Sequence, residues 1–236
     1  MDQVNIEDIF KAQGGEFISP PSFIEQKLAS IKGFVFDWDG VFNDSFKGDN
    51  TGSPFSEADS MGLNMVRFSY YLKFGFIPEL FIITGENNQP AITLAKRESF
   101  SAVFLQVKHK VDTLSVLEQE YRLQPKELAF TFDDILDLGL AKQVVLRFLV
   151  KRDASPLLTA MTIRESWTDY LTANGGGSFA VREITELIIG LNGNFEEVVQ
   201  NRIDFTDTYQ TYLRLRNEKT PKVYSGKSGE IIAASS

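Results

Sequence analysis

The sequence predicts an α/β fold, a Rossmann-like doubly wound parallel sheet covered by helices on both faces. First, the chain has 236 residues, 43% of them hydrophobic, which suits one compact domain with a sizeable core. Second, short apolar runs alternate with segments of helical spacing. Third, polar residues, most of them acidic, follow directly after several of the apolar runs.

The apolar runs have the length and composition of buried strands. They lie at residues 33–37, 80–83, 102–105, 128–132 and 144–150. Helical spacing is found at residues 64–74, 89–98, 111–121, from 136 onward, and at 179–191 and 195–215. In a doubly wound sheet of order 3-2-1-4-5, the first run would lie between the second and the fourth.

The stretch 41–56 interrupts this alternation. It carries a turn-rich segment at residues 48–52 between short aromatic-containing arms, which predicts a small β-hairpin insertion. A large cap domain would need many more residues at this point. We expect an N-terminal extension at residues 1–30, the α/β domain at 31–192, and a C-terminal helix with a flexible tail at 193–236.

Composition excludes several classes of function. The net charge is -8, which disfavours an electrostatic grip on nucleic acid or anionic lipid. The chain has no Cys and a single His, so thiolate zinc sites, cysteine nucleophiles and histidine metal clusters are excluded or improbable. The acidic N-terminus without an apolar region and the lack of a long apolar run lead us to expect a cytoplasmic protein without a membrane span.

Four groups of residues could carry chemistry, each close to the end of a predicted strand or the start of a helix. They are Asp37 with Asp39, Thr84 with Gly85, Lys110, and Asp133 with Asp134 and Asp137. Ligands bind at the carboxyl ends of strands in open α/β sheets, where the strand order reverses. Asp37, Thr84 and Asp133 should therefore be neighbours around one crevice.

Such a crevice would suit phosphate chemistry with a metal ion. Several carboxylates close together need a cation to relieve their repulsion. Oxygen ligands without His or Cys favour a hard ion, Mg²⁺ before Ca²⁺ or Zn²⁺. Lys110 would add positive charge, and the Thr84 hydroxyl could donate to a phosphoryl oxygen. The expected partner is a small-molecule phosphate ester.

Each motif also has a plainer interpretation. An isolated D-x-D is usually a solvated turn, and only the ordered combination of all four groups indicates a site. Lys108 competes with Lys110 for the same role. We expect His109 to be a surface residue at a helix start and Trp38 to be a packing residue.

The order of these motifs resembles that of the haloacid dehalogenase superfamily. From about residue 31 to 191 the chain is similar to the capless subgroup that contains 3-deoxy-D-manno-octulosonate 8-phosphate phosphatases and N-acylneuraminate 9-phosphate phosphatases. The resemblance rests on Asp37-Trp38-Asp39-Gly40-Val41-Phe42-Asn43-Asp44, Asp59-Ser60-Met61-Gly62, Ile83-Thr84-Gly85, Lys110, Asp133-Asp134-Ile135-Leu136-Asp137, and Gly176-Gly177 with Ala180-Val181-Arg182-Glu183.

The resemblance implies a Mg²⁺-dependent phosphatase of a sugar or sugar-acid phosphate. Asp37 would attack phosphorus, and Asp39 would protonate the leaving oxygen and then activate water. Asp37, the Asp39 backbone carbonyl and Asp133 would bind the metal. Thr84, Gly85 and Lys110 would hold the phosphoryl group, with Asp134, Asp137 and Asp59 in support; Asp134 would hold the metal's waters or orient Lys110. The subgroup also implies a homotetramer, in which a neighbour's C-terminal region closes the site.

Three positions depart from the subgroup's pattern. Phe132 replaces the usual Gly and would place a ring beside the metal aspartates, His109 replaces an Asp, and Ser178 replaces an Arg that often follows Gly-Gly. Loss of that guanidinium predicts weak turnover of 3-deoxy-D-manno-octulosonate 8-phosphate, unless another basic residue such as Arg182, Lys222 or Lys227 compensates.

Two functions of other classes stay open. A non-catalytic oligomerisation module would keep the fold without turnover. A receiver-like phospho-acceptor would keep a stable phosphate on Asp37, although the D-x-D-G spacing fits that class poorly.

Overall fold

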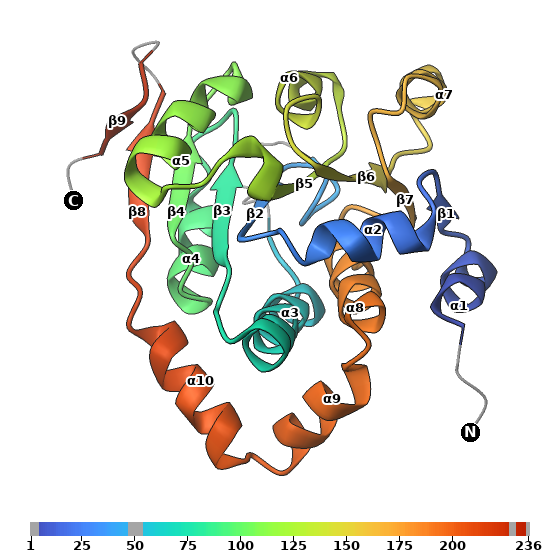
Figure 1. Cartoon of the computed structure of the whole chain (residues 1–236). Helices are drawn as coiled ribbons and strands as arrows, with labels where there is room; N and C mark the ends of the chain where they lie inside the picture. Colours follow the sequence, from blue (N-terminus) through green and yellow to red (C-terminus); the bar gives the residue numbers. More distant parts are fainter. Residues whose placement is uncertain (1–4, 47–53, 227–229, 235–236) are drawn as a thin grey trace.

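A mostly parallel sheet forms the centre of the molecule, as the sequence predicts, and in the described part of the chain it has nine strands rather than the five expected (Figure 1). The computed structural model describes residues 5–46, 54–226 and 230–234. Within them the strand order is β1-β7-β6-β5-β2-β3-β4-β8-β9. The five expected strands occupy the order β4-β3-β2-β5-β6, which confirms the 3-2-1-4-5 arrangement with the first strand between the second and the fourth.

The strands are β1 (Glu16–Phe17), β2 (Gly33–Asp37), β3 (Glu79–Ile83), β4 (Ala102–Leu105), β5 (Leu128–Phe132), β6 (Leu146–Lys151), β7 (Tyr170–Gly175), β8 (Lys222–Ser225) and β9 (Ile232–Ala233). The helices are α1 (Ile6–Gln13), α2 (Pro21–Leu28), α3 (Glu57–Phe74), α4 (Gln89–Arg97), α5 (Thr113–Tyr121), α6 (Leu138–Ala141), α7 (Pro156–Arg164), α8 (Ala180–Asn192), α9 (Phe195–Ile203) and α10 (Asp207–Asn217). Short 3₁₀ turns are η1 (Lys110–Asp112), η2 (Pro125–Glu127) and η3 (Ile135–Asp137).

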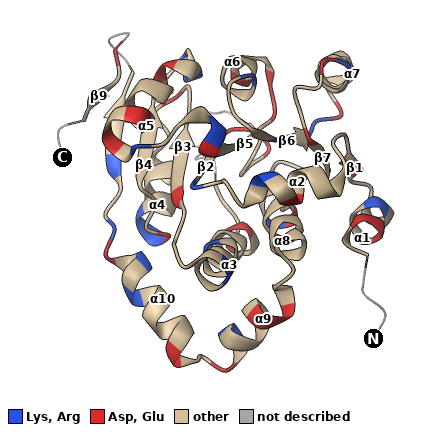
Figure 2. Ribbon diagram, in the orientation of Figure 1, with Lys and Arg blue, Asp and Glu red and all other residues tan. Residues whose placement is uncertain are grey.

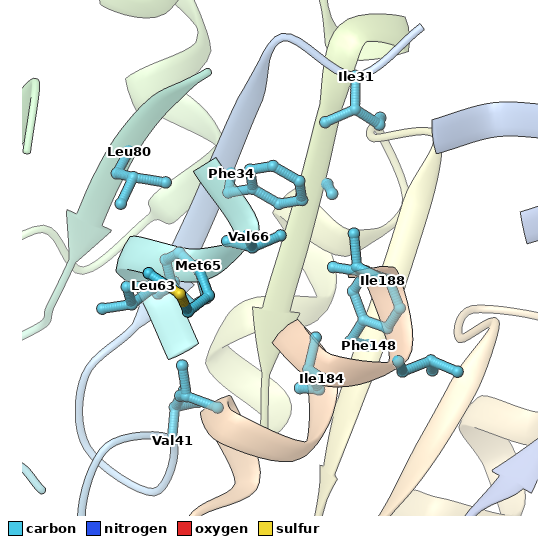
Figure 3. Packing of buried hydrophobic residues seen from close by; sticks show 14 of the residues in the cluster. Ile31, Phe34, Val41, Leu63, Met65, Val66, Leu80, Phe148, Ile184 and Ile188 are labelled. Atoms are coloured by element: carbon cyan, nitrogen blue, oxygen red, sulfur yellow. The ribbon is translucent and has the colours of Figure 1, made fainter. Parts of the chain in front are cut away.

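Two apolar clusters cover the two faces of the sheet. The larger one packs α2, α3, α4 and α8 against one face, and Figure 3 shows Phe34 and Phe148 of the sheet meeting Val66 of α3 and Ile188 of α8. The smaller one packs α5, α6 and α7 against the other face. Figure 1 shows α3 and α8 on one side of the sheet and α5, α6 and α7 on the other. Burial on both faces explains why the central strands are continuous apolar runs rather than alternating ones.

Both ends of the chain add strands to the sheet. β1 pairs antiparallel with β7, and α1 and α2 pack beside it. At the opposite edge β8 pairs parallel with β4, and β9 pairs antiparallel with β8. The residues expected to form a flexible tail thus contribute two strands to the sheet.

The helix expected at 195–215 is two helices, α9 and α10. Phe205 has a positive φ of 48°, which an α-helix does not allow, and the Thr206 hydroxyl accepts from the Tyr209 backbone N–H to start a new helix. The sequence interpretation was wrong because apolar spacing continues across this break. The turn of the hairpin expected at 41–56 lies outside the described residues, and the described residues beside it form no named strand.

Charge is spread over the molecule rather than gathered by sign. Figure 2 shows Lys and Arg segments interspersed with acidic ones over α1, α9 and α10. Among the described residues, no helix combines the length and apolar character needed to cross a membrane.

Candidate active site

The carboxyl ends of three neighbouring parallel strands bring the predicted site residues together. Asp37 is the last residue of β2, Thr84 follows β3, and Asp133 follows β5. Asp37 lies in register with Ile83, and Phe36 with Thr131, so the three tips are adjacent. The arrangement expected from the strand order is therefore present in the structure.

Lys110 lies at the centre of this cluster, between two carboxylates. Its ammonium group pairs with the Asp37 carboxylate at 2.5 Å and also with Asp137. Lys110 is buried at the start of η1, whereas Lys108 is exposed and pairs with Glu86. Lys110, and not Lys108, is therefore the lysine that meets the carboxylates of Asp37 and Asp137.

Burial sets the electrostatics of these groups. Desolvation, and next the negative charge of Asp137, raise the pKa of Asp37 to about 7 despite the nearby Lys110. Desolvation, with the charges of Asp37 and Asp137, raises the pKa of Asp133 to about 9. Burial alone would lower the pKa of Lys110, but Asp37 and Asp137 outweigh it and hold that pKa above its usual value. Three buried carboxylates, those of Asp37, Asp133 and Asp137, thus lie close together around one ammonium group, with the Arg152 guanidinium against Asp133.

Asn88 joins the two strand ends on the β3 side. Its side-chain amide donates to the Asp39 carboxylate at 3.0 Å and lies 2.8 Å from the Thr84 hydroxyl. Thr84 is fully buried, and its hydroxyl also accepts from the Glu86 backbone N–H. Asp39 is half-buried on the turn at Gly40, whose φ of 86° favours glycine.

Asp133 is held on the β6 side by Arg152. The guanidinium of Arg152 lies 2.7 Å from Asp133 Oδ2, 3.4 Å from Asp134 Oδ2 and 2.7 Å from the Ser45 hydroxyl. Within the described residues neither carboxylate oxygen of Asp133 has a well-directed hydrogen-bond donor. The ion pair at 2.7 Å satisfies distance but not direction, so Asp133 keeps capacity to bind a further cation.

The acidic groups suit a hard metal ion. Oxygen atoms of Asp37, Asp133 and Asp137 all lie within 4.8 Å of one another. Asp137 already pairs with Lys110, and its Oδ2 accepts from the backbone N–H groups of Asp133 and Asp134. Asp133 offers buried oxygens without such donors, so Asp37 and Asp133 are the pair with most capacity for Mg²⁺.

Asp134, Asp137 and Asp59 differ in their surroundings. Asp137, rather than Asp134, is the carboxylate that contacts Lys110, whereas Asp134 caps η3 and faces Arg152. Asp59 accepts from the Ser56 hydroxyl and from the backbone N–H of Arg182, so it joins the start of α3 to the start of α8.

The burial of three further residues can be compared with the roles expected from the sequence. Trp38 is fully buried and stacks on Phe42, which confirms a packing role. His109 is exposed and contacts Asp112, as expected of a surface residue. The Phe132 ring was expected beside the metal aspartates, but it is fully buried and stacks on Phe130 in the smaller apolar cluster. Side chains alternate along a strand, so Phe130 and Phe132 lie on the same face of the sheet, the one covered by the smaller apolar cluster.

A cavity of about 240 Å³ opens beside Arg152, the residue that pairs with Asp133. Its lining is Gly40, Asn43, Asp44, Lys151, Arg152, Asp153, Ala173, Gly175 and Gly176. A Cβ on Gly176 would lie 2.2 Å from the Gly40 carbonyl oxygen, so glycine allows β7 and the loop after β2 to approach closely.

Asn88 and Arg152 were missed by the sequence interpretation. Arg152 lies two residues beyond the strand predicted at 144–150 and directly follows β6, at the sheet edge where ligands bind, and that position could have identified it. Asn88 precedes α4 at a position where an ordinary helix cap is expected, although its side chain makes no capping bond there.

Comparison with known proteins supports this description. No family model matches the chain. The 3-deoxy-D-manno-octulosonate 8-phosphate phosphatase of Escherichia coli (strain K12) is 26% identical over 175 residues, covering 72% of this chain and 86% of that protein.

Two solved structures are similar along most of their length. The phosphatase of the same name from Moraxella catarrhalis, in complex with magnesium ion, phosphate ion and KDO, has a TM-score of 0.62 at 26% identity, covering 75% of this chain and 97% of that one. A hydrolase assigned to subfamily III A of the HAD superfamily, from Legionella pneumophila, has a TM-score of 0.63 at 26% identity, covering 78% and 95%. In fold, motifs and sequence the chain is therefore similar to phosphatases of the haloacid dehalogenase superfamily, among them the 3-deoxy-D-manno-octulosonate 8-phosphate phosphatases.

Proposed function

We propose that the chain is a Mg²⁺-dependent phosphomonoester hydrolase that works through an aspartyl-phosphate on Asp37. The observation that carries this proposal is the meeting of Asp37, Lys110 and Asp133 at the ends of β2 and β5, with Asp39 and Thr84 joined by Asn88. A nucleophile, a fixed cation, a candidate metal ligand and a candidate proton donor thus surround one crevice.

The chemistry has two steps. A carboxylate oxygen of Asp37 attacks phosphorus and the bond to the ester oxygen breaks, while Asp39 gives that oxygen a proton. Asp39, now ionised, takes a proton from water, whose oxygen attacks the phosphorus of the aspartyl-phosphate. Inorganic phosphate leaves and Asp37 is regenerated. Lys110 and the Thr84 hydroxyl would hold the phosphoryl oxygens through both steps.

Asp37, Asp133 and the Asp39 backbone carbonyl would hold the Mg²⁺. When bound, the ion supplies positive charge that keeps Asp37 ionised and offsets repulsion between its carboxylate and a phosphate dianion. This role fits the burial that raises the pKa of Asp37 and Asp133, because a bound cation would favour the ionised form of both carboxylates. The magnesium in the Moraxella catarrhalis relative supports the same choice of metal.

The substrate in this proposal is a small phosphorylated sugar or sugar acid. The names of the relatives support the sugar-acid class. The proposal also includes a cytoplasmic homotetramer. Exposed apolar side chains at the carboxyl edge of the sheet support association there, namely Phe46, Ile135, Leu136, Leu157 and Phe179.

Turnover of p-nitrophenyl phosphate by the wild type and by Asp37→Asn tests the proposal. The amide is a very poor nucleophile, so Asp37→Asn should lower kcat at least about a thousandfold while the fold persists. Asp112→Asn, an equal change at an exposed carboxylate, should keep wild-type activity. No turnover by the wild type in Mg²⁺ would favour a non-catalytic module, and a stable phospho-Asp37 would favour a receiver-like protein.

A further inference from the structure

The loop that leads from β4 to Lys110, residues 106–109, begins with a strained residue. Gln106, the first residue after β4, has a positive φ of 58°. That conformation is uncommon for a residue with a side chain, and it persists where surrounding contacts hold it. The next residue, Val107, is buried, and Lys110 follows three positions later at the start of η1. The path of the chain at Gln106 therefore decides where Lys110 enters the crevice.

The loop after β3 holds one side of this loop. The Gln106 backbone N–H donates to the Glu86 carbonyl at 3.2 Å, and the Val107 N–H donates to the Thr84 carbonyl at 3.0 Å. Thr84 is also the residue whose hydroxyl would bind the phosphoryl group. These two bonds tie the loop 106–109 to the crevice from the β3 side.

The C-terminal segment holds the other side. β8 lies alongside β4 at this edge of the sheet, with Ser225 in register with Leu105 (Figure 1). The Gly226 N–H donates to the Leu105 carbonyl at 2.9 Å. A Cβ on Gly226 would lie 3.0 Å from the Gln106 carbonyl oxygen and 3.2 Å from Val107 Cα. Glycine thus lets the end of the segment lie directly against the loop backbone.

β8 is itself fixed by contacts with β4 and α5. The buried Tyr224 ring stacks on Phe104, with centroids 4.8 Å apart and an interplanar angle of 12°. The Tyr224 hydroxyl donates to the Glu120 carboxylate of α5 at 2.5 Å, and Lys222 pairs with the same carboxylate at 2.8 Å. The position of Gly226 is therefore set by side chains on both of these elements.

We propose that the segment 222–226 positions Lys110 through the loop 106–109. The proposal rests on the proposed phosphatase function, because Lys110 is the group that would bind the phosphoryl oxygens. Held from both sides, the loop keeps the Lys110 ammonium group against the Asp37 carboxylate at 2.5 Å. Loosening one side lets the ammonium group leave that position, and the phosphoryl group would then lose a well-placed partner in both steps.

Two substitutions in the segment disturb the loop by different routes. Gly226→Ala adds a methyl group that pushes against the backbone of Gln106 and Val107. Tyr224→Leu removes the stacked ring and its hydroxyl, which loosens the strand. A variant that fails to fold leaves the other to decide. Gly139→Ala is the matched control, at an exposed glycine of α6 whose Cβ would meet no described atom within 4 Å.

The first readout is kcat/KM for p-nitrophenyl phosphate in Mg²⁺, with each substitution made in the wild type and in a Lys110→Met chain. Gly226→Ala and Tyr224→Leu should each lower kcat/KM at least about fivefold in the wild type. In the Lys110→Met chain, measured at high enzyme concentration, either should lower it by less than about twofold, because the group through which they act is gone. Gly139→Ala should keep the wild-type value.

The second readout is hydrogen exchange of the full chain, followed by mass spectrometry without substrate. Peptides over residues 104–112 should exchange faster in Gly226→Ala and Tyr224→Leu than in the wild type, while peptides over β2 should keep the wild-type rate. A local change of this kind separates positioning of the loop from a general loss of stability.

Three outcomes would overturn the proposal: unchanged kcat/KM in the folded variants, an equal loss in the Lys110→Met chain, or faster exchange along the whole chain instead of the loop. The second outcome would mean that the segment acts on another part of the site. Failure of the phosphatase function looks different, because the wild type would then be inactive while exchange at 104–112 would still respond to Gly226→Ala.

Discussion

Asn88 connects the proposed general acid to the proposed phosphoryl-binding hydroxyl. One amide nitrogen lies 3.0 Å from Asp39 and 2.8 Å from Thr84, so a single side chain fixes two groups on different strand ends. Removing it takes one hydrogen bond from the Asp39 carboxylate and one neighbour from the Thr84 hydroxyl. Asn88 is therefore a positioning residue for the proton transfer.

Asn88→Ala should lower kcat by about tenfold, the equivalent of roughly 1.4 kcal/mol, with a small change in KM. The free energy of unfolding should change little by comparison, since Asn88 acts on the two groups that it contacts. Gln89→Ala, next in the chain and exposed, is the control. A loss of stability with unchanged kcat would mean that Asn88 only supports the loop.

Charged and polar residues that end apolar runs could be identified from the sequence, because parallel strands all end at one edge of the sheet. That reasoning predicted the neighbourhood of Asp37, Thr84, Lys110 and Asp133. It could not predict which carboxylate faces Lys110, since Asp134 and Asp137 are close in sequence and differ only in how η3 turns. Such choices depend on local backbone geometry that spacing does not encode.

At the scale of elements, α10 is joined to α3 by a buried polar network. The Asn64 side chain on α3 contacts Tyr209, Tyr212 and Arg216 of α10. Arg216 also contacts the Glu98 carboxylate at 3.0 Å. α10 leads directly into β8, so this network positions the strand that covers the free edge of β4.

Arg216→Ala should destabilise the protein by about 2–4 kcal/mol, because it leaves the buried Glu98 carboxylate and Asn64 oxygen with fewer donors. Arg214→Ala, an exposed arginine of the same helix, should change stability by less than about 0.5 kcal/mol. Chemical denaturation of both variants measures the difference. Equal stabilities would show that the network contributes little.

The five central strands and their order could be predicted from the apolar runs. The strands that the two ends of the chain add to the sheet could not. β1, β8 and β9 are two to four residues long, and their pairing depends on long-range contacts rather than on a local apolar pattern. The division of the last helical segment into α9 and α10 rests on the backbone of Phe205, a residue whose side chain fits either interpretation.

At the scale of the whole molecule, the buried carboxylates make both folding stability and metal binding depend on pH. The pKa of Asp37 is raised from 3.8 to about 7 and that of Asp133 to about 9 in the folded protein. The folded state therefore holds protons that the unfolded state has released above pH 4 or so. Without metal, stability from these groups should fall as pH rises from about 4 to about 9.

Mg²⁺ requires the ionised carboxylates, so its stabilising effect should grow over the same pH range. We expect the rise in Tm on adding Mg²⁺ to be larger at pH 8.5 than at pH 5.5 by about 3 °C, or roughly 1 kcal/mol for a chain of this size. Asp133→Asn should lose most of this response. A metal-induced shift of equal size at both pH values would contradict the proposed coupling.

The central claim, that Asp37 is transiently phosphorylated, is tested most directly by chemical trapping during turnover. Borohydride reduces an acyl phosphate to an alcohol, so quenching the enzyme with borohydride in the presence of p-nitrophenyl phosphate and Mg²⁺ should convert residue 37 to homoserine. Peptide mass spectrometry should find this change at Asp37 alone, and not in protein without substrate. Turnover with no reduced residue, or with reduction at another aspartate, would contradict the account.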